Sequence, residues 1–439
     1  MNLSFSSLNC FGIFVAKRQF TASSPLGLGV LAMAVIPDTM SLKTFGFRFS
    51  LSSALLMMGA GIQLPFLPLW LQAKGLSVAQ ITAVVAAMTA TRVVGAPLFA
   101  ALADYTGRRF LVIRSCAIGA VLCYGLLSQA QSYSMIMFLG LLAALLFAPI
   151  FPLIEGFSIE SAARLGLEYG RLRLWASVSF LVGSIASGAM LTLLPAQDTM
   201  LLITGAQLLS VGATFVLPPE PPHPPHLVQI MPLQLGAALK FLFASRFTVF
   251  VAAASLANCS HGLLYAVSSL HLARLGFDTF QIGVLWAAAV LAEVALFFFS
   301  GRLVKEVSMP RLLCIGLFGA AMRWVGMSYA TEFYQIAMLQ TLHCLSFATS
   351  HLSLMHFIRM HVPQNLRNSA QGLYVAFASG LLLSSVTWVS GPLYSTFGAE
   401  SFLFMAGIAL LGLAIAAFNL LKLSPTVLQG QGASNHSHI

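Results

Sequence analysis

Charged residues are scarce in this chain. Only 8% of its 439 residues are Asp, Glu, Lys or Arg, 58% are hydrophobic, and the mean hydropathy is +0.89. An ordinary soluble domain carries about 25% charged residues. Because so few charges cannot cover a water-soluble surface, much of the apolar content must face lipid, where only helices and closed barrels satisfy their backbone groups. The apolar runs are long rather than alternating, which favours helices.

Motifs of metal-binding, disulfide-linked and enzymatic proteins are also missing. The six cysteines form no CxxC or Cys/His spacing, so neither a disulfide framework nor a zinc site is indicated, and we expect no metal. No nucleotide or nucleophile motif indicates an enzyme. The net charge of +10 comes from basic residues that lie between apolar runs and are not interleaved with aromatics. That distribution excludes nucleic-acid binding and fits the positive-inside rule of membrane proteins, whose partner is lipid.

Twelve apolar segments follow one another along the chain. Each is near or above the roughly 20 residues that cross a bilayer as a helix. We therefore predict an all-α membrane protein with twelve transmembrane helices. The predicted spans are 46–73, 78–103, 109–130, 133–158, 172–194, 198–217, 245–273, 278–304, 309–329, 333–360, 369–397 and 400–422.

A proline-rich stretch, PPEPPHPPH at 218–226, separates the first six segments from the last six. Such a run cannot be helical, so it marks a linker. Residues 1–43 read as a dispensable or misassigned leader, with a signal peptide as the alternative. The predicted organisation is a leader at 1–43, a six-helix bundle at 44–217, a cytoplasmic linker at 218–244, a second six-helix bundle at 245–423 and a tail at 424–439.

The loops differ strongly in charge between the two sides of the membrane. One side carries most of the Lys and Arg residues, whereas the other side holds only Lys74 and Arg274. By the positive-inside rule, both termini lie in the cytoplasm. We expect a monomeric, multi-pass protein of a bacterial inner membrane.

The two halves are related in sequence. Gly75-Leu-Ser-Val-Ala-Gln80 aligns with Gly276-Phe-Asp-Thr-Phe-Gln281, a shift of 276 − 75 = 201 residues, and both stretches stand at a predicted helix start. A direct repeat of six helices is typical of transporters whose halves rock about a central site.

The loop after the second segment resembles a known family signature. Leu102-Ala-Asp104-Tyr-Thr-Gly107-Arg108-Arg109 resembles the G-x-L-A-D-R-x-G-R-R/K loop of the major facilitator superfamily, with Ala100 and Tyr105 as departures. Gly107 permits a tight turn and the arginines hold the loop in the cytoplasm. The resemblance implies the major facilitator fold, two six-helix bundles around a central cavity, and a conformational role for Asp104, Gly107, Arg108 and Arg109.

A narrower resemblance spans about residues 46–422. The stretches Gly61–Leu71, Tyr169–Trp175 and Leu342–His351 are similar to the 3-phenylpropionate permease group, which is related to lactose permease, a proton symporter. This resemblance implies proton-coupled uptake of a small aromatic carboxylate. It also implies a substrate site formed by Glu155 and Arg173.

The same resemblance places Arg323 and His343 in the proton-coupling network. Two acids of lactose permease are absent, since their positions hold Ser346 and Val290, and Glu293 lies one helical turn beyond the latter. Only apolar residues flank Glu293, and a carboxyl group in such surroundings holds a proton more readily than in water. We therefore expect Glu293 to carry the proton.

Each of these residues also has a structural interpretation. Glu155 and Arg173 can form a structural ion pair, and Glu293 can be a structural partner of Arg323 or Arg92. His343 and His351 lie about 80° apart on a helix and can edge one cavity for proton coupling, or they can be packing residues. Arg92 either holds its helix to a neighbour or binds an anion.

Two transport functions remain open from the sequence. The first is symport of a small organic solute with protons, driven by the proton gradient without a cofactor. The alternative is a proton-driven efflux antiporter for drugs or metabolites. The fifth segment reads Leu174-Trp-Ala-Ser-Val-Ser-Phe180 rather than the glycine-rich run of efflux proteins, which favours uptake.

Overall fold

The computed structural model describes residues 42–167, 169–218, 245–299, 302–303, 306–363 and 367–422. Within these ranges the chain is helical and contains no strand, as predicted. Nearly all of the predicted leader and linker, and the whole predicted tail, lie outside the described residues.

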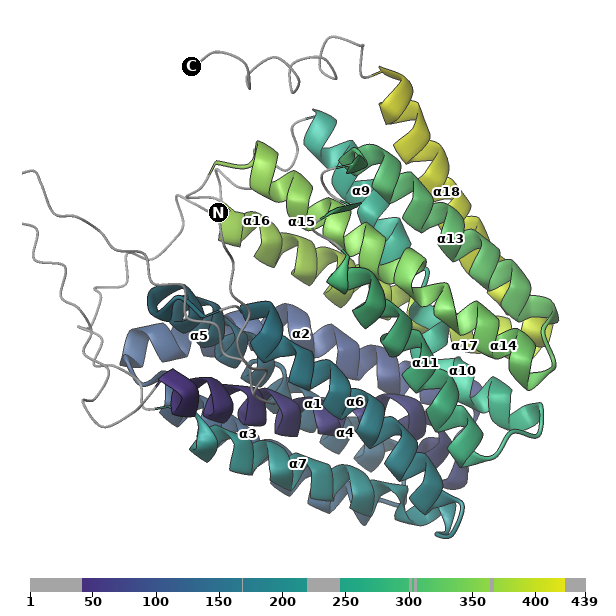
Figure 1. Ribbon diagram of the computed structural model, residues 1–439. Coiled ribbons are helices and arrows are strands. Elements are labelled where there is room, and N and C mark those ends of the chain that lie inside the picture. The colour runs from purple at the N-terminus through teal and green to yellow at the C-terminus, as the bar shows by residue number, and fades with distance from the viewer. Residues whose placement is uncertain are drawn as a thin grey trace, which may run out of the picture.

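The first half supplies one group of helices, drawn purple to teal in the lower part of Figure 1. One predicted span of this half, 133–158, is divided into two helices, and Pro149 stands between the end of the first and the start of the second. The helices are α1 (Leu42–Ala73), α2 (Val78–Thr106), α3 (Arg109–Ser128), α4 (Tyr133–Phe147), α5 (Ile150–Leu165), α6 (Tyr169–Leu191) and α7 (Thr199–Val216).

The second half forms the upper group, drawn green to yellow (Figure 1). Two of its spans contain π-helical turns, Cys344–Thr349 and Val375–Leu382, and such turns often mark functional sites. The helices are α9 (Ser245–Cys259), α10 (Gly262–Arg274), α11 (Thr279–Phe298), α13 (Met309–Tyr329), α14 (Phe333–Thr341), α15 (Ser350–His361), α16 (Arg367–Tyr374), α17 (Leu383–Phe397) and α18 (Ser401–Lys422).

Ten helical stretches of the described chain are long and apolar enough to cross a membrane. The predicted count of twelve is thus confirmed in part. One of the ten, Ala370–Phe418, has 49 residues and is divided by the short turn Gly398–Glu400 into two segments. The remaining predicted span corresponds to α14, its π-turn and α15, which is not among the ten.

Apolar side chains on the outer faces of the helices fit a lipid environment. Large hydrophobic residues are exposed on both halves, as a protein surrounded by hydrocarbon requires. They include Leu122, Phe138, Phe298, Trp388 and Phe418.

The repeat has a structural basis in two matching helix starts. Gly75 and Gly276 adopt the left-handed conformation, with φ of 81° and 91°, and each ends a helix. Two residues later, Ser77 caps α2 and Asp278 caps α11, each in a reciprocal capping box with the Gln three positions on. The spacing shared by the two halves therefore encodes the same turn and the same helix start in each.

The two halves pack tightly at one end of the molecule, which we call the packed end: the end where α2 and α11 begin and α6 and α17 finish. Gly188 of α6 lies against the backbone of Thr279, and Gly391 lies against Thr82 of α2. Gly283 lies against the carbonyl oxygen of Ser184, whose hydroxyl donates to the Gly283 carbonyl at 3.0 Å. Glycine at these positions permits close approach of the backbones.

The contacts at the packed end follow the sequence repeat between the two halves. In the α2–α17 contact Gly391 meets Ala79 Cα, and in the α11–α6 contact Gly188 meets Phe280 Cα, at nearly equivalent positions since 280 − 79 = 201 and 391 − 188 = 203. The first difference is the shift found between the sequences of the halves. The packed end is thus built from one contact used twice.

Candidate functional site

A buried polar cluster lies in the second half, centred on Arg323 of α13. Its side chain is fully buried, and its guanidinium lies 4.6 Å from the ring centre of Trp324. One nitrogen donates to His343 Nδ1 at 2.9 Å and to Ser346 Oγ at 3.3 Å, while the other donates to Gln340 Oε1. A buried cation in a membrane helix needs such acceptors. The structure thus brings together Arg323 and His343, the two residues that the family resemblance grouped.

The contact with Arg323 fixes the protonation state of His343. A guanidinium has only N–H donors, so the Nδ1 atom that it contacts must be an acceptor. His343 is therefore neutral and carries its hydrogen on Nε2, an assignment made from the hydrogen-bond network. That nitrogen faces Glu293 Oε2 at 3.6 Å, which is too long for a good hydrogen bond. The carboxyl of Glu293 thus ends a chain that runs from Arg323 through His343.

A third basic residue, His261, completes the cluster, and the sequence analysis did not identify it. It is buried between α9 and α10, its Nδ1 donates to the Ala257 carbonyl at 3.0 Å, and its Nε2 accepts from Ser346 Oγ at 3.2 Å. The available signal was the presence of an ionisable residue in the interior of the span 245–273, which in a membrane helix indicates a function or a buried partner.

His351 lies near the same cluster through stacked rings. Phe347 stacks on His343, with ring centres 5.4 Å apart, and on His351, with ring centres 5.9 Å apart. The π-helical turn that begins at Cys344 lies between the two histidines. Both histidines therefore lie on one face, as their spacing predicted, with an aromatic ring between them.

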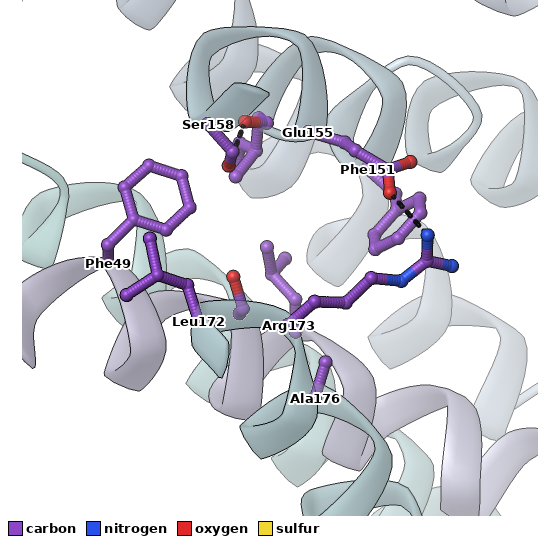
Figure 2. A pocket seen from close by; sticks show the side chains of 10 residues that line it. Phe49, Phe151, Glu155, Ser158, Leu172, Arg173 and Ala176 are labelled. Carbon is purple, nitrogen blue, oxygen red and sulfur yellow. Dashed lines mark hydrogen bonds and ion pairs between the residues drawn. The ribbon is translucent and has the colours of Figure 1, made fainter. Parts of the chain in front are cut away.

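Glu155 and Arg173 form an ion pair in the first half. Arg173 of α6 lies 3.0 Å from the Glu155 carboxylate of α5, in a pocket of about 330 Å³. Figure 2 shows the guanidinium reaching across the pocket to the carboxylate beside Phe151. The side chain of Arg173 is 53% exposed and that of Glu155 is 24% exposed, so the pair is open to a solute.

The Glu155–Arg173 pair of the first half also acts electrostatically on groups of the second half. Arg173 is an electrostatic partner of both Glu293 and His351. A charge on the first half therefore acts directly on the carboxyl group at the end of the second-half cluster. This arrangement can bind an ion or a polar solute between the halves and can couple it to the charge of Glu293.

Residues 48–406 match the MFS_1 like family. The chain belongs to this family. It is a multi-pass membrane transporter of small molecules and not an enzyme, as expected from the sequence.

Two curated relatives are transporters by name. A protein of Escherichia coli (strain K12) named "Probable 3-phenylpropionic acid transporter" is 27% identical over 351 residues, covering 80% of this chain and 91% of the relative. The "Maltose permease" of Geobacillus stearothermophilus is 24% identical over 350 residues, covering 79% of this chain and 86% of the relative.

Solved structures of transporters share the fold. The nucleoside transporter NupG superimposes with a TM-score of 0.74 at 15% identity, covering 86% of this chain and 99% of NupG. A bacterial homolog of the human lysosomal transporter Spinster, in an inward-facing and occupied conformation, gives a TM-score of 0.65 at 12% identity, covering 86% and 96%. At these identities the likeness shows the fold alone.

The family's signature loop adopts the turn that its sequence predicts. Gly107 ends α2 in the left-handed conformation, with φ of 63°, and Arg108 is the N-cap residue of α3. Arg109 lies 3.6 Å from Glu160 of α5, which ties the loop to the rest of the first half. Asp104 and Arg108 are exposed.

Proposed function

We propose that this MFS_1-like transporter takes up a small organic solute, such as an aromatic carboxylate, together with protons, by alternating access. It would act as a monomer in a bacterial inner membrane, with both termini in the cytoplasm, driven by the proton gradient without a cofactor. The observation that carries the proposal is the chain Arg323–His343–Glu293, whose carboxyl end lies within electrostatic reach of Arg173 on the other half.

Glu293 is the favoured proton acceptor of this chain. A second proton on His343 would place two donors face to face, because Arg323 already donates to Nδ1. A proton on Glu293 meets no such obstacle. Arg323, His343 and His351 would then tune and position this carboxyl group rather than carry the proton themselves.

Protonation of Glu293 also offers a means of coupling. The ionised carboxylate attracts Arg173, which belongs to the other half. Protonation makes the carboxyl group neutral and removes this attraction between the halves. The cationic groups are then available to bind an anionic solute. Proton and solute would thus bind together before the halves rock, as symport requires. Arg173 and Glu155 are the proposed solute contacts in the first half.

The substrate class comes from the relative named for 3-phenylpropionic acid. The test is proton flux in proteoliposomes that contain the purified protein. Adding 3-phenylpropionate outside should make the external medium more alkaline as protons enter with the solute. Maltose, the sugar for which the other relative is named, is the second solute to add outside. Acidification of the medium would instead support the antiport alternative, and no response to either solute would refute uptake of both.

A further inference from the structure

A second and larger pocket lies between the halves. It encloses about 750 Å³, and four helices of the first half and α10 of the second half contribute to its wall. No carboxylate is among the residues that line it. Its polar side chains are Gln63, Thr89, Arg92, Tyr124 and Tyr265, and the rest of its lining is apolar.

Arg92 of α2 provides the only charge among these lining residues. Its guanidinium is exposed to the pocket, and its electrostatic partners are the hydroxyls of Tyr124 and Tyr265. Within the described part of the chain, no carboxylate lies at ion-pair distance from Arg92. Arg173, by contrast, has Glu155 at 3.0 Å. A cation inside the membrane without a counter-ion is costly, so this pocket favours an anionic occupant.

Gln63 adds a second donor to the same pocket. Its Oε1 accepts from the Tyr124 hydroxyl and from Gln207 Nε2, both at 3.1 Å. With its oxygen occupied by these two donors, the amide N–H₂ of Gln63 is left to donate. A guanidinium and an amide N–H₂ on one pocket wall match the two oxygens of a carboxylate.

Tyr265 connects this pocket to the proton site. It comes from α10 of the second half, and its ring centre lies 6.5 Å from that of Trp286. Its hydroxyl interacts electrostatically with Arg92, Glu293 and Arg323. An anion on Arg92 would therefore lie one side chain away from the proton-carrying cluster.

We propose that Arg92, assisted by Gln63, binds the carboxylate of the transported solute at a second position, in addition to the contacts proposed at Glu155 and Arg173. Tyr265 is the side chain that couples this anion site electrostatically to Glu293. The apolar lining, which includes Leu64, Val85 and Phe147, would hold the hydrocarbon part of the solute. This inference rests on the proposed function in that the solute is an organic anion. It makes Arg92 the residue that selects acids over neutral analogues.

The first test compares an acid with its uncharged amide. Binding of 3-phenylpropionate and of 3-phenylpropionamide is measured for the purified parent, Arg92→Gln, Arg92→Lys and the control Arg311→Gln, which removes an exposed charge at the start of α13. Arg92→Gln should weaken acid binding about ten- to hundredfold, the loss expected for a charge-assisted hydrogen bond, and leave amide binding unchanged. Arg92→Lys should recover part of the loss. Parent-like acid binding by Arg92→Gln would overturn the inference while leaving the proposed function intact.

A second test does not depend on the identity of the solute. Thr89 lines the pocket three residues before Arg92, so a Thr89→Cys variant, made with the six native cysteines replaced, reports the local potential. The rate of labelling by an anionic thiosulfonate, relative to a cationic one, should fall about tenfold when Arg92→Gln is added. If the parent protein binds no aromatic carboxylate, the proposed substrate class is wrong. The labelling ratio then tests by itself whether Arg92 forms an anion site. A labelling ratio that does not change when Arg92→Gln is added would refute the anion site.

Discussion

Replacing Gly283 with alanine tests whether glycine contacts close the packed end. A Cβ at this position would overlap the Ser184 carbonyl oxygen and lie 3.1 Å from the Ser184 carbonyl carbon and 3.5 Å from Ile185 Cα. These are backbone atoms that cannot rotate away, so α6 and α11 must separate. Separation also weakens two hydrogen bonds, from Ser184 Oγ to the Gly283 carbonyl at 3.0 Å and from Thr279 Oγ1 to the Gly188 carbonyl at 2.9 Å.

The cost of the substitution follows from these contacts. Each lost hydrogen bond is worth about 1 kcal/mol net, and overpacking adds about 1–3 kcal/mol. Even the hydrogen bonds alone, about 2 kcal/mol together, would shift the ratio of packed to open molecules about thirtyfold. The variant should therefore populate a conformation that is open at this end, and its transport rate should fall with that shift.

The assay is the distance between spin labels at Gln131 and Thr331, exposed loop positions on the two halves at the packed end. Gly283→Ala should broaden the distance distribution toward longer values. The matched control is Gly205→Ala on α7, where an added Cβ meets nothing within 4 Å. If Gly283→Ala gives the same distribution as Gly205→Ala, the glycine contacts are not what holds this end together.

Three further substitutions probe the polar groups. Arg323→Gln should lower the thermal midpoint in detergent by several degrees and abolish transport, since buried acceptors lose their donor at about 1–3 kcal/mol each; an unchanged midpoint would contradict the buried network. Glu160→Gln should slow transport without lowering the thermal midpoint, because the ion pair of Glu160 with Arg109 is partly exposed and worth at most about 1 kcal/mol. A large loss of thermal stability would instead show that this ion pair has a structural role only. Arg173→Gln and Glu155→Gln should each reduce the affinity for the solute. In thermal stability, a double-mutant cycle of the two should give a coupling energy below about 1 kcal/mol, as expected for an ion pair that is open to solvent. If neither variant changes the affinity, the ion pair has a structural role only.

Local sequence signals predicted the helices and the repeat well. Gly75 and Gly276 required a left-handed backbone, and the Ser or Asp followed by Gln three positions later specified a capping box, so both turns could be predicted without tertiary information. The proline at 149 likewise interrupts its helix inside a single predicted span. Rules of this kind involve residues at most four positions apart, which a single sequence displays directly.

The site depended on contacts that a sequence does not display. His261 joins the Arg323 cluster through Ser346, which is 85 residues away in the sequence and lies between them. The tautomer of His343 follows from a donor on another helix. The separation of the charges into a paired Arg173 and an Arg92 without a described carboxylate partner likewise arises from helix packing. Sequence reasoning identified most of the ionisable residues because they are rare in membrane spans. The family resemblance grouped Glu155 with Arg173 and Arg323 with His343, but nothing in the sequence joined His261 to the second pair.

The most direct test of proton coupling through Glu293 separates accumulation from exchange. Proteoliposomes with the parent, Glu293→Gln or the control Glu400→Gln, which changes an exposed acid outside the cavity, are given labelled 3-phenylpropionate. We predict that Glu293→Gln still exchanges internal for external solute at a parent-like rate but no longer accumulates it when an inward proton gradient is applied, while Glu400→Gln does both. Gradient-driven accumulation by Glu293→Gln equal to that of the parent would contradict the account.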